Sequence, residues 1–374
     1  MTHFTAETIA TLEGLEALET SWNELVASME FPEIFYSWEW TYHYYKHYQP
    51  DDRLQIILVR HSSGRLAAIA PLRVRETRRL GVRIRVLETI VTEIGDYQNI
   101  LIHPDFHRGR VVGTIMSHLR LIEDSWDILD LSQLNSRDPT SFHVLNVAQG
   151  HMDWSVRSQM LTPVAVRNLR GGRVVEKKRQ IRQIANRLET LQKEGYAVSV
   201  GRSDIDTLWP SFSSLHRHAW RESPLNTPHG RRFFDALIHA EGMRGKIELS
   251  VMELEGRTVA MHFGFVDKRK VYYYMPAMDR SFKQERVGAV LLYAIVEHYR
   301  GSHEEIDFLR GMEEYKNWYT DDLDMNMRIV VYRTSNFRAF VHNLREALHR
   351  FAVDLGLPKA VAQIVRRAWN RIKG

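Results

Sequence analysis

The stretch YYYMPAMDRSFKQERVGAVLLYAIVEHY at residues 272–299, followed by EIDFLRGMEEYKNWY at 305–319, decides the fold of this chain. It predicts a strand, a short polar loop, a helix that opens at 287–289, and another strand. The first N–H groups of such a helix have no partner inside the helix, and Gly288 permits close approach of a ligand. The positive end of the helix dipole, with Lys283 and Arg286 as counter-charges, suits a pyrophosphate.

Apolar residues repeat at helical spacing directly after this loop. Val287, Val290, Leu291, Ala294 and Ile295 follow the i, i+3, i+4, i+7, i+8 pattern of a helix with one buried face. The pattern therefore predicts an amphipathic helix over 287–299.

Two halves of the chain share a similar order of apolar runs. Such runs, separated by turns, are typical of strands. The predicted strands are 54–59, 66–74, 85–91 and 126–131 in the first half, and 247–254, 258–266, 271–278 and 305–309 in the second. Two short matches favour a duplication: GRLAA at 64–68 with GRTVA at 256–260, and 128–131 with 305–308. We therefore expect an α/β protein with two related lobes.

Three further segments are predicted to be helical. The aromatic stretch 34–48 has Ser37 placed to cap a helix and favours core packing. The basic segment 171–195, with Val174, Ile181, Ile184 and Leu188 along one side, predicts a connecting helix that stops at Gly195. The third segment, 336–374, has a stripe of Phe and Leu and carries eight Lys and Arg against two acidic residues. Packing onto the body and attachment to an anionic membrane face are both open for this tail.

Composition and missing motifs exclude several classes of function. The 374 residues have no signal peptide pattern and no apolar run of about 20 residues, so we expect a cytoplasmic protein that is at most peripheral to the inner membrane. The chain contains no cysteine, which excludes disulfides and a cysteine nucleophile. It also lacks the GxSxG, GxxxxGK[ST], HExxH and GxGxxG motifs. The pairs His43/His47 and His216/His218 have no obvious third ligand, so we expect no metal site.

The sequence resembles the CelD/BcsL group of GNAT-like acyltransferases, which are related in fold to the FemAB aminoacyl transferases. The matching segments are IFYSWEW at 34–40, GRLAAIAPL at 64–72, GDYQN at 95–99, the connecting helix, the region around Gly288, and DFLRGMEEYKNWY at 307–319. The resemblance implies a double GNAT fold of mixed sheets flanked by helices, and acyl transfer from acyl-coenzyme A. Some relatives are linked to exopolysaccharide production. GNAT enzymes carry Q/R-x-x-G-x-G/A at the pyrophosphate turn, whereas residues 285–290 match that pattern only at Gly288.

Attack of an amine or hydroxyl on a thioester needs a base, an oxyanion donor and a proton for the leaving thiolate. The predicted roles are a base for Asp96, His262 or Glu313, a phenolic proton from Tyr315, and stabilisation of developing charge by Lys316. Each of these residues also has a purely structural interpretation. The predicted donor contacts are Tyr274, Met275, Lys283, Arg286, Val287, Gly288 and Ala289.

The resemblance leaves three functions open. The first is acyl transfer to a sugar, an amino sugar or a small amine. The second is FemAB-like transfer from aminoacyl-tRNA, with the basic run 167–193 on the RNA backbone, and the third is a non-catalytic binding protein. The predicted segments are an N-terminal lobe at 1–165, a connecting helix at 166–195, a donor-binding lobe at 196–335 and a helical tail at 336–374. We predict that the acceptor lies in a groove between the lobes, near Asp96 and Tyr97 on one side and Glu313, Tyr315 and Lys316 on the other.

Overall fold

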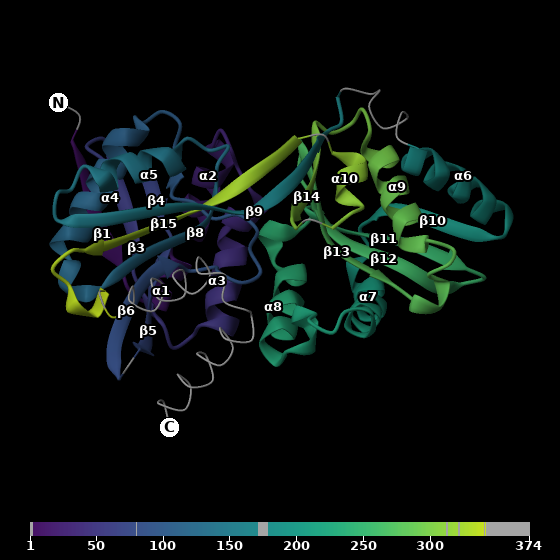
Figure 1. The fold of residues 1–374 in the computed structure, drawn as a ribbon, viewed down its shortest axis with the longest axis horizontal. Helices are drawn as coiled ribbons and strands as arrows, with labels where there is room; N and C mark the ends of the chain where they lie inside the picture. Colours follow the sequence, from purple (N-terminus) through teal and green to yellow (C-terminus); the bar gives the residue numbers. More distant parts are fainter. Residues whose placement is uncertain are drawn as a thin grey trace, which may run out of the picture. The chain divides into compact units, whose positions relative to one another are not determined.

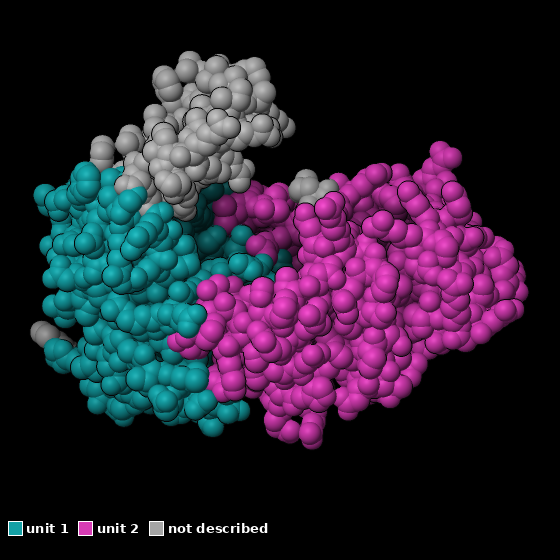
Figure 2. Space-filling view, turned by 90° about the horizontal axis from the view of Figure 1, so that it is seen from below, with its two compact units in different colours: residues 1–38, 51–160, 327–374 teal, residues 39–50, 161–326 magenta. Residues whose placement is uncertain are grey.

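A computed structural model describes residues 3–79, 81–170, 179–311, 313–320, 322–339 and 341. The chain forms two compact units, coloured separately in Figure 2. Unit 1 contains Met1–Trp38, Asp51–Met160 and Met327–Gly374, and unit 2 contains Glu39–Pro50 and Leu161–Asn326. The compact units therefore differ from the contiguous lobes expected from the sequence, because the segment 39–50 packs with the second unit and strand residues from 327 onward pack with the first.

Unit 1 is an α/β unit with two groups of strands (Figure 1). Its elements are β1 (Phe4–Ile9), α1 (Leu12–Glu16), α2 (Glu19–Ser28), η1 (Ile34–Tyr36), β2 (Arg53–Leu54), β3 (Ile56–His61), β4 (Leu66–Ala70), β5 (Leu72–Arg79), β6 (Val82–Thr89), β7 (Leu101–Ile102), α4 (Arg108–Leu121), η2 (Glu123–Ser125), β8 (Ile128–Asn135) and α5 (Thr140–Gln149). One sheet has the order β1-β3-β4-β7, and a second run of strands has the order β8-β6-β5-β2. The predicted strand 66–74 is thus divided at Pro71 into β4 and β5, which lie in different sheets.

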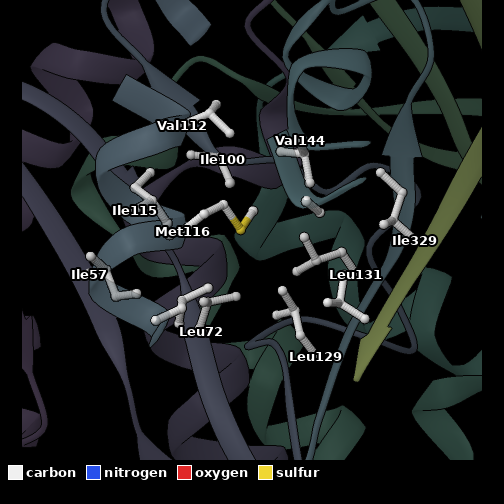
Figure 3. Packing of buried hydrophobic residues seen from close by; sticks show 14 of the residues in the cluster. Ile57, Leu72, Ile100, Val112, Ile115, Met116, Leu129, Leu131, Val144 and Ile329 are labelled. Carbon is white, nitrogen blue, oxygen red and sulfur yellow. The ribbon is translucent and has the colours of Figure 1, made fainter. Parts of the chain in front are cut away.

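The core of unit 1 lies between its strands and helices α4 and α5. Figure 3 shows Val112, Ile115 and Met116 of α4 packed with sheet residues such as Leu72 and Leu129. All five side chains are at most 2% exposed. Burial of side chains of this size supplies most of the stabilising free energy of such a unit.

Unit 2 has one run of strands, in the order β10-β11-β12-β13-β14-β9. Its elements are α3 (Trp38–Tyr48), α6 (Arg179–Lys193), β10 (Tyr196–Arg202), α7 (Ile205–Ala219), η4 (Pro224–Asn226), α8 (Pro228–His239), η5 (Glu241–Met243), β11 (Ile247–Leu254), β12 (Arg257–Val266), β13 (Lys270–Met278), η6 (Arg280–Phe282), α9 (Val287–Tyr299), β14 (Glu305–Arg310) and α10 (Lys316–Tyr319). Strands β9 (Trp154–Asn168) and β15 (Asp322–Arg333) contribute residues to both units. Helices α6 and α9 pack on one face of the strands with α10, and α7 packs on the other face (Figure 1). The helix predicted over 287–299 is confirmed at both ends.

The two units repeat one order of elements, so the expected α/β fold with two related units is confirmed. In each unit an opening strand is followed by helices and then by antiparallel strands, and a helix leads from these to a strand with a parallel partner. Parallel pairing joins β6 to β8 at 86–88 with 128–130, and β13 to β14 at 270–272 with 305–307. In both units the parallel pairing therefore begins at the first residue of the matched segment, Ile128 in one and Glu305 in the other.

Two predicted helical segments differ from the structure. Residues 166–168 belong to strand β9, so the connecting helix begins later, and its described part is α6, with Ile181 and Ile184 buried. At the start of the predicted tail, Ala339 is fully buried beside Ile84 and Val330 of unit 1. The remainder of that tail lies outside the described residues. Within the described part of the chain, no helix is long and apolar enough to cross a membrane.

Candidate functional site

Strands β13 and β14 pair over a short distance and then separate. Their parallel pairing covers only 270–272 with 305–307, although β13 continues to Met278 and β14 to Arg310. Beyond the paired residues, the rings of Tyr273 and Phe308 face each other edge-on at 6.1 Å. The strands thus open towards their carboxyl ends.

A β-bulge on β13 lies at the point where the strands begin to separate. Phe263 of β12 pairs with Met275 and Phe265 pairs with Tyr272, so β13 has one extra residue at this point. The residue opposite the bulge is Gly264, where a Cβ atom would lie 2.7 Å from the Tyr272 carbonyl oxygen. A larger residue at 264 would therefore displace the bulge. The bulge changes the direction in which the backbone groups of Tyr273 and Tyr274 point.

His262, a predicted base, is part of the support for this bulge. Its Nε2 accepts the Tyr274 N–H at 3.1 Å, and its ring stacks on Tyr273 with centroids 4.3 Å apart. Complete burial lowers the pKa of His262 to about 3, so the ring is neutral at neutral pH. The lone pair of Nε2 is already used by a backbone N–H, which favours a positioning role over proton abstraction.

The end of β14 is held in an unusual conformation by two charged side chains. Leu309 has a φ of 62°, a left-handed conformation that is unfavourable for a branched side chain. Its N–H donates to the Asp307 carboxylate at 2.8 Å, and its carbonyl accepts from Lys316 Nζ at 3.3 Å. Lys316 Nζ also donates to the Arg310 carbonyl at 2.7 Å and pairs with Glu313 at 2.9 Å. Asp307 and Lys316 of the segment 307–319 therefore both contact Leu309, and Lys316 helps to hold the end of the strand in place.

Tyr315 and Glu313 lie on the segment between β14 and α10. Burial, and secondarily the negative charge of Glu313, raise the pKa of Tyr315, so its phenol stays protonated. The Tyr315 ring lies 6.2 Å from that of Tyr273, at the separated part of the strands. The Glu313 side chain is 54% exposed. Gly311 has a φ of 130°, a conformation that L side chains rarely adopt, so glycine is favoured there. The pair presents one proton donor and one exposed carboxylate.

The amino end of α9 has the features expected for an anion site. Arg286 precedes the helix in a left-handed conformation with a φ of 58°, and its carbonyl accepts the N–H groups of Ala289 and Val290. A Cβ atom on Gly288 would meet only the flexible end of Met278, at 3.2 Å, so the backbone at Gly288 is accessible. The Arg286 guanidinium lies over the Trp318 ring, 5.5 Å from its centroid, and Lys283 is exposed. The Val287 side chain is fully buried, so only its backbone is available to a ligand.

Three arginines near this loop were missed as site residues by sequence reasoning. Arg187 of α6 donates from Nε to the Glu285 carbonyl at 3.4 Å. Arg257 pairs with Asp279, and Arg280 donates to the Ala219 carbonyl at 2.7 Å. Arg187 belongs to the basic run noted in the sequence, but only the packing of α6 beside α9 brings it to the loop.

The corresponding region of unit 1 is organised differently. The GDYQN segment follows β6, and the Gln98 N–H donates to the Gln133 carbonyl of β8 at 2.8 Å. Gln98 also forms a parallel bridge with Leu134, so this segment continues the pairing that β6 began. Asp96 and Tyr97 are buried in unit 1 at 8% and 3% exposure. Asp96 belongs to unit 1, and the other four predicted catalytic residues belong to unit 2.

Buried histidines of unit 2 predict an acid-sensitive stability. Burial lowers the pKa of His262 to about 3 and that of His216 to about 4, from an ordinary value of 6.5. Between these values the unfolded chain binds protons that the folded unit does not, so stability falls as the pH falls below 6.5. We expect a loss of up to about 1.4 kcal/mol per pH unit for each ring between pH 6 and 4.5. Urea unfolding at several pH values measures this slope, and His216→Asn should reduce it, whereas His218→Asn, at an exposed position, should not.

The matching family model lies within unit 2 and covers less than half of the chain. Residues 176–317 match the model described as an acetyltransferase (GNAT) domain. The chain therefore contains a GNAT-type domain, which indicates an acyltransferase and spans the strands, the loop and the helices described above. No curated protein matches the sequence at a significant level.

The similarity to solved structures extends over both units. FemX matches with a TM-score of 0.58 at 11% identity, covering 83% of this chain and 95% of FemX. The C-terminal DUF2156 domain of an Agrobacterium fabrum protein matches with a TM-score of 0.54 at 9% identity, covering 89% and 96% of the two chains. L-PGS from Bacillus licheniformis matches with a TM-score of 0.50 at 11% identity, covering 84% and 92%. At these identities the similarity shows the fold alone.

Proposed function

We propose that unit 2 transfers an acyl group from acyl-coenzyme A to an amine or hydroxyl of a sugar, amino sugar or small amine. The observation that carries the proposal is the separation of β13 and β14 beside the amino end of α9. An extended thioester arm needs an open strand edge, and a pyrophosphate needs unpaired N–H groups with nearby cations. Unit 2 offers both within one strand-loop-helix segment.

The residues around the opening fit such a donor. The Asp279 N–H bonds to the Val259 carbonyl of β12, so by the alternation of antiparallel pairing the carbonyl of Pro276 faces away from β12. That carbonyl accepts from the Trp220 indole at 2.6 Å, which places a half-exposed aromatic ring against this edge. The backbone N–H groups of Val287 and Gly288, with the cations of Lys283 and Arg286, would hold the pyrophosphate, whereas the Ala289 N–H already donates to the Arg286 carbonyl. When bound, the thioester supplies the activated acyl group.

We assign distinct roles to the residues on the β14 side. Glu313 is exposed and carries the carboxylate that would accept the proton of the acceptor, and the protonated Tyr315 would donate to the leaving thiolate. Lys316 acts as a positioning residue, because its contacts hold Leu309 and Arg310. The proposal includes membership of the CelD/BcsL group and a role in exopolysaccharide production. It also includes transfer of the acyl group to either a nitrogen or an oxygen of the acceptor.

Thermal unfolding with and without coenzyme A tests the donor assignment. A ligand that binds only the folded state stabilises it by about 2.7 kcal/mol at a concentration of 100 times Kd. We expect coenzyme A and acetyl-coenzyme A to raise the unfolding temperature, and pantetheine to raise it much less because it lacks the phosphates. Absence of any shift with free, acetyl- and longer acyl-coenzyme A at millimolar concentration would exclude the proposal.

A further inference from the structure

Two buried polar atoms on the central strands of unit 2 have no hydrogen-bond partner among the described residues. They are Oε1 of Glu248 on β11 and Nδ1 of His262 on β12. Glu248 is only 6% exposed, and His262 is fully buried. A buried polar atom without a partner is destabilising and rare in folded proteins, so both atoms require an explanation.

The strand register places these two side chains on one face of the sheet. Glu248 pairs with Gly264, and Ser250 pairs with His262. Directly opposite residues of antiparallel strands point to the same face, as do residues two positions apart along one strand. Glu248 accepts a hydrogen bond from the Tyr299 hydroxyl of α9, so this is the face that α9 covers. Glu248, Ser250 and His262 are therefore a polar group beneath α9.

The missing side chain at Gly264 allows the His262 ring to lie next to Glu248. A Cβ atom on Gly264 would lie 2.3 Å from Cε1 of His262, so the ring occupies the space over Gly264. Glu248 is the residue directly across from Gly264 on β11. The carboxyl and the imidazole are therefore neighbours, although they form no direct hydrogen bond.

The orientation of the His262 ring directs a proton donor towards β11. The ring is neutral and its Nε2 accepts the Tyr274 N–H of β13, so Nδ1 carries the proton. The two nitrogens of an imidazole point away from each other, and β11 and β13 flank β12 on opposite sides. The Nδ1 proton therefore points to the side of β12 on which Glu248 and Ser250 lie.

Glu248 and Ser250 supply oxygen atoms on that side. Oε2 of Glu248 is used by Tyr299, and Oε1 is the atom without a partner in the described part of the chain. The buried Ser250 hydroxyl accepts the Gly201 N–H at 3.4 Å and still has its own proton to donate. Burial raises the pKa of the Glu248 carboxyl, as expected in an enclosed site. One N–H, one carboxyl oxygen and one hydroxyl are enough partners for a buried water molecule.

We infer that Glu248, Ser250 and His262 hold one internal water molecule, and that Glu248 is a positioning residue for the bulge on β13. The water accepts from Nδ1 of His262 and donates to Oε1 of Glu248. It thereby keeps the imidazole in the form whose Nε2 accepts the Tyr274 N–H, at the point where β13 and β14 separate. The effect on turnover rests on the proposed acyl transfer, whereas the water site can be measured without donor or acceptor.

The test is NMR spectroscopy of the full chain with isotope-labelled histidine, in which His262→Gln identifies the His262 signals. We expect a proton on Nδ1 that shows a nuclear Overhauser effect to a bound water molecule. Glu248→Met removes the acceptor but keeps the volume of the side chain, so the effect should disappear. Glu248→Gln retains an acceptor oxygen and should preserve it.

The matched control is Glu253→Met, which makes the same substitution near the other end of β11. It should leave the water contact and turnover unchanged. With acetyl-coenzyme A and a panel of amino sugars, turnover should fall about fivefold in Glu248→Met, the effect of losing one hydrogen bond of about 1 kcal/mol. Glu248→Gln should restore turnover, and coenzyme A affinity should change less than about twofold in either variant.

Two sets of outcomes would contradict the inference. The absence of the water contact in the wild-type chain, or its persistence in Glu248→Met, would exclude the water site. Equal losses of turnover in Glu248→Met and Glu253→Met would exclude the positioning role of Glu248. If the water contact changes as expected while the wild-type chain turns over no acetyl-coenzyme A, the proposed acyl transfer alone fails.

Discussion

Replacing Gly288 with aspartate is expected to abolish stabilisation by coenzyme A while leaving unit 2 folded. Gly288 lies in the first turn of α9, where a pyrophosphate would meet the backbone N–H groups. An added carboxylate about 4 Å from a phosphate costs roughly 4 kcal/mol at an effective dielectric constant of 20, and solvent screening reduces this. We therefore expect affinity to fall by at least about 30-fold, which corresponds to roughly 2 kcal/mol.

Two substitutions at the same position separate charge from shape. Gly288→Asn has nearly the same size as the aspartate variant without its charge, and Gly288→Ala adds one carbon that meets only the Met278 sulfur. Isothermal titration with coenzyme A should show a small loss for Ala, an intermediate loss for Asn and the largest loss for Asp, with a salt dependence confined to Asp. Unchanged affinity in a folded Gly288→Asp variant would place the donor elsewhere.

The strands and the helix near this site could be predicted from the sequence, because their apolar residues follow a simple pattern. The spacing from Val287 to Ile295 predicts α9, and the apolar runs 126–131 and 305–309 predict the strands observed as β8 and β14. The connecting helix is only partly predicted, because residues 166–168 carry the same basic composition but extend strand β9. Composition does not distinguish a solvated strand end from a solvated helix.

The local geometry of the candidate site could not be predicted from the sequence. The bulge at Tyr273 and Tyr274 depends on pairing with β12, and it needs Gly264, which is nine residues away along the chain. The left-handed Leu309 has none of the glycine or asparagine signal that usually marks this conformation. Lys316 was predicted to act on developing charge, and its contacts with three oxygen atoms, which no sequence signal indicates, favour a positioning role.

The contacts of Lys316 predict that its substitution lowers both the stability of unit 2 and the turnover rate. Its side chain is 4% exposed and donates to the carbonyls of Leu309 and Arg310. Hydrogen bonds from a charged donor contribute about 1.5–3 kcal/mol each, and the pair with the exposed Glu313 adds little. Lys316→Met keeps the apolar length of the side chain but removes these bonds, so we expect unit 2 to lose about 3 kcal/mol of unfolding free energy. Asp307→Asn keeps an oxygen that accepts the Leu309 N–H but removes the ion pair of the buried Asp307 with Lys270, so we expect a loss of a similar size.

Because Asp307 accepts the N–H of Leu309 and Lys316 donates to the carbonyl of the same residue, the effects of Lys316→Met and Asp307→Asn should not be additive. A double-mutant cycle on urea unfolding should give a coupling of about 0.5–3 kcal/mol, the range for residues that share one network.

If the loop at Leu309 positions Glu313 and Tyr315, turnover should fall at least about tenfold in Lys316→Met, whereas coenzyme A affinity changes less than about threefold. Release of free thiol from acetyl-coenzyme A with a panel of amino sugars measures turnover without background, because the chain has no cysteine. Equal losses of turnover and donor affinity, or strict additivity of the two substitutions, would show that Lys316 does not act through Leu309.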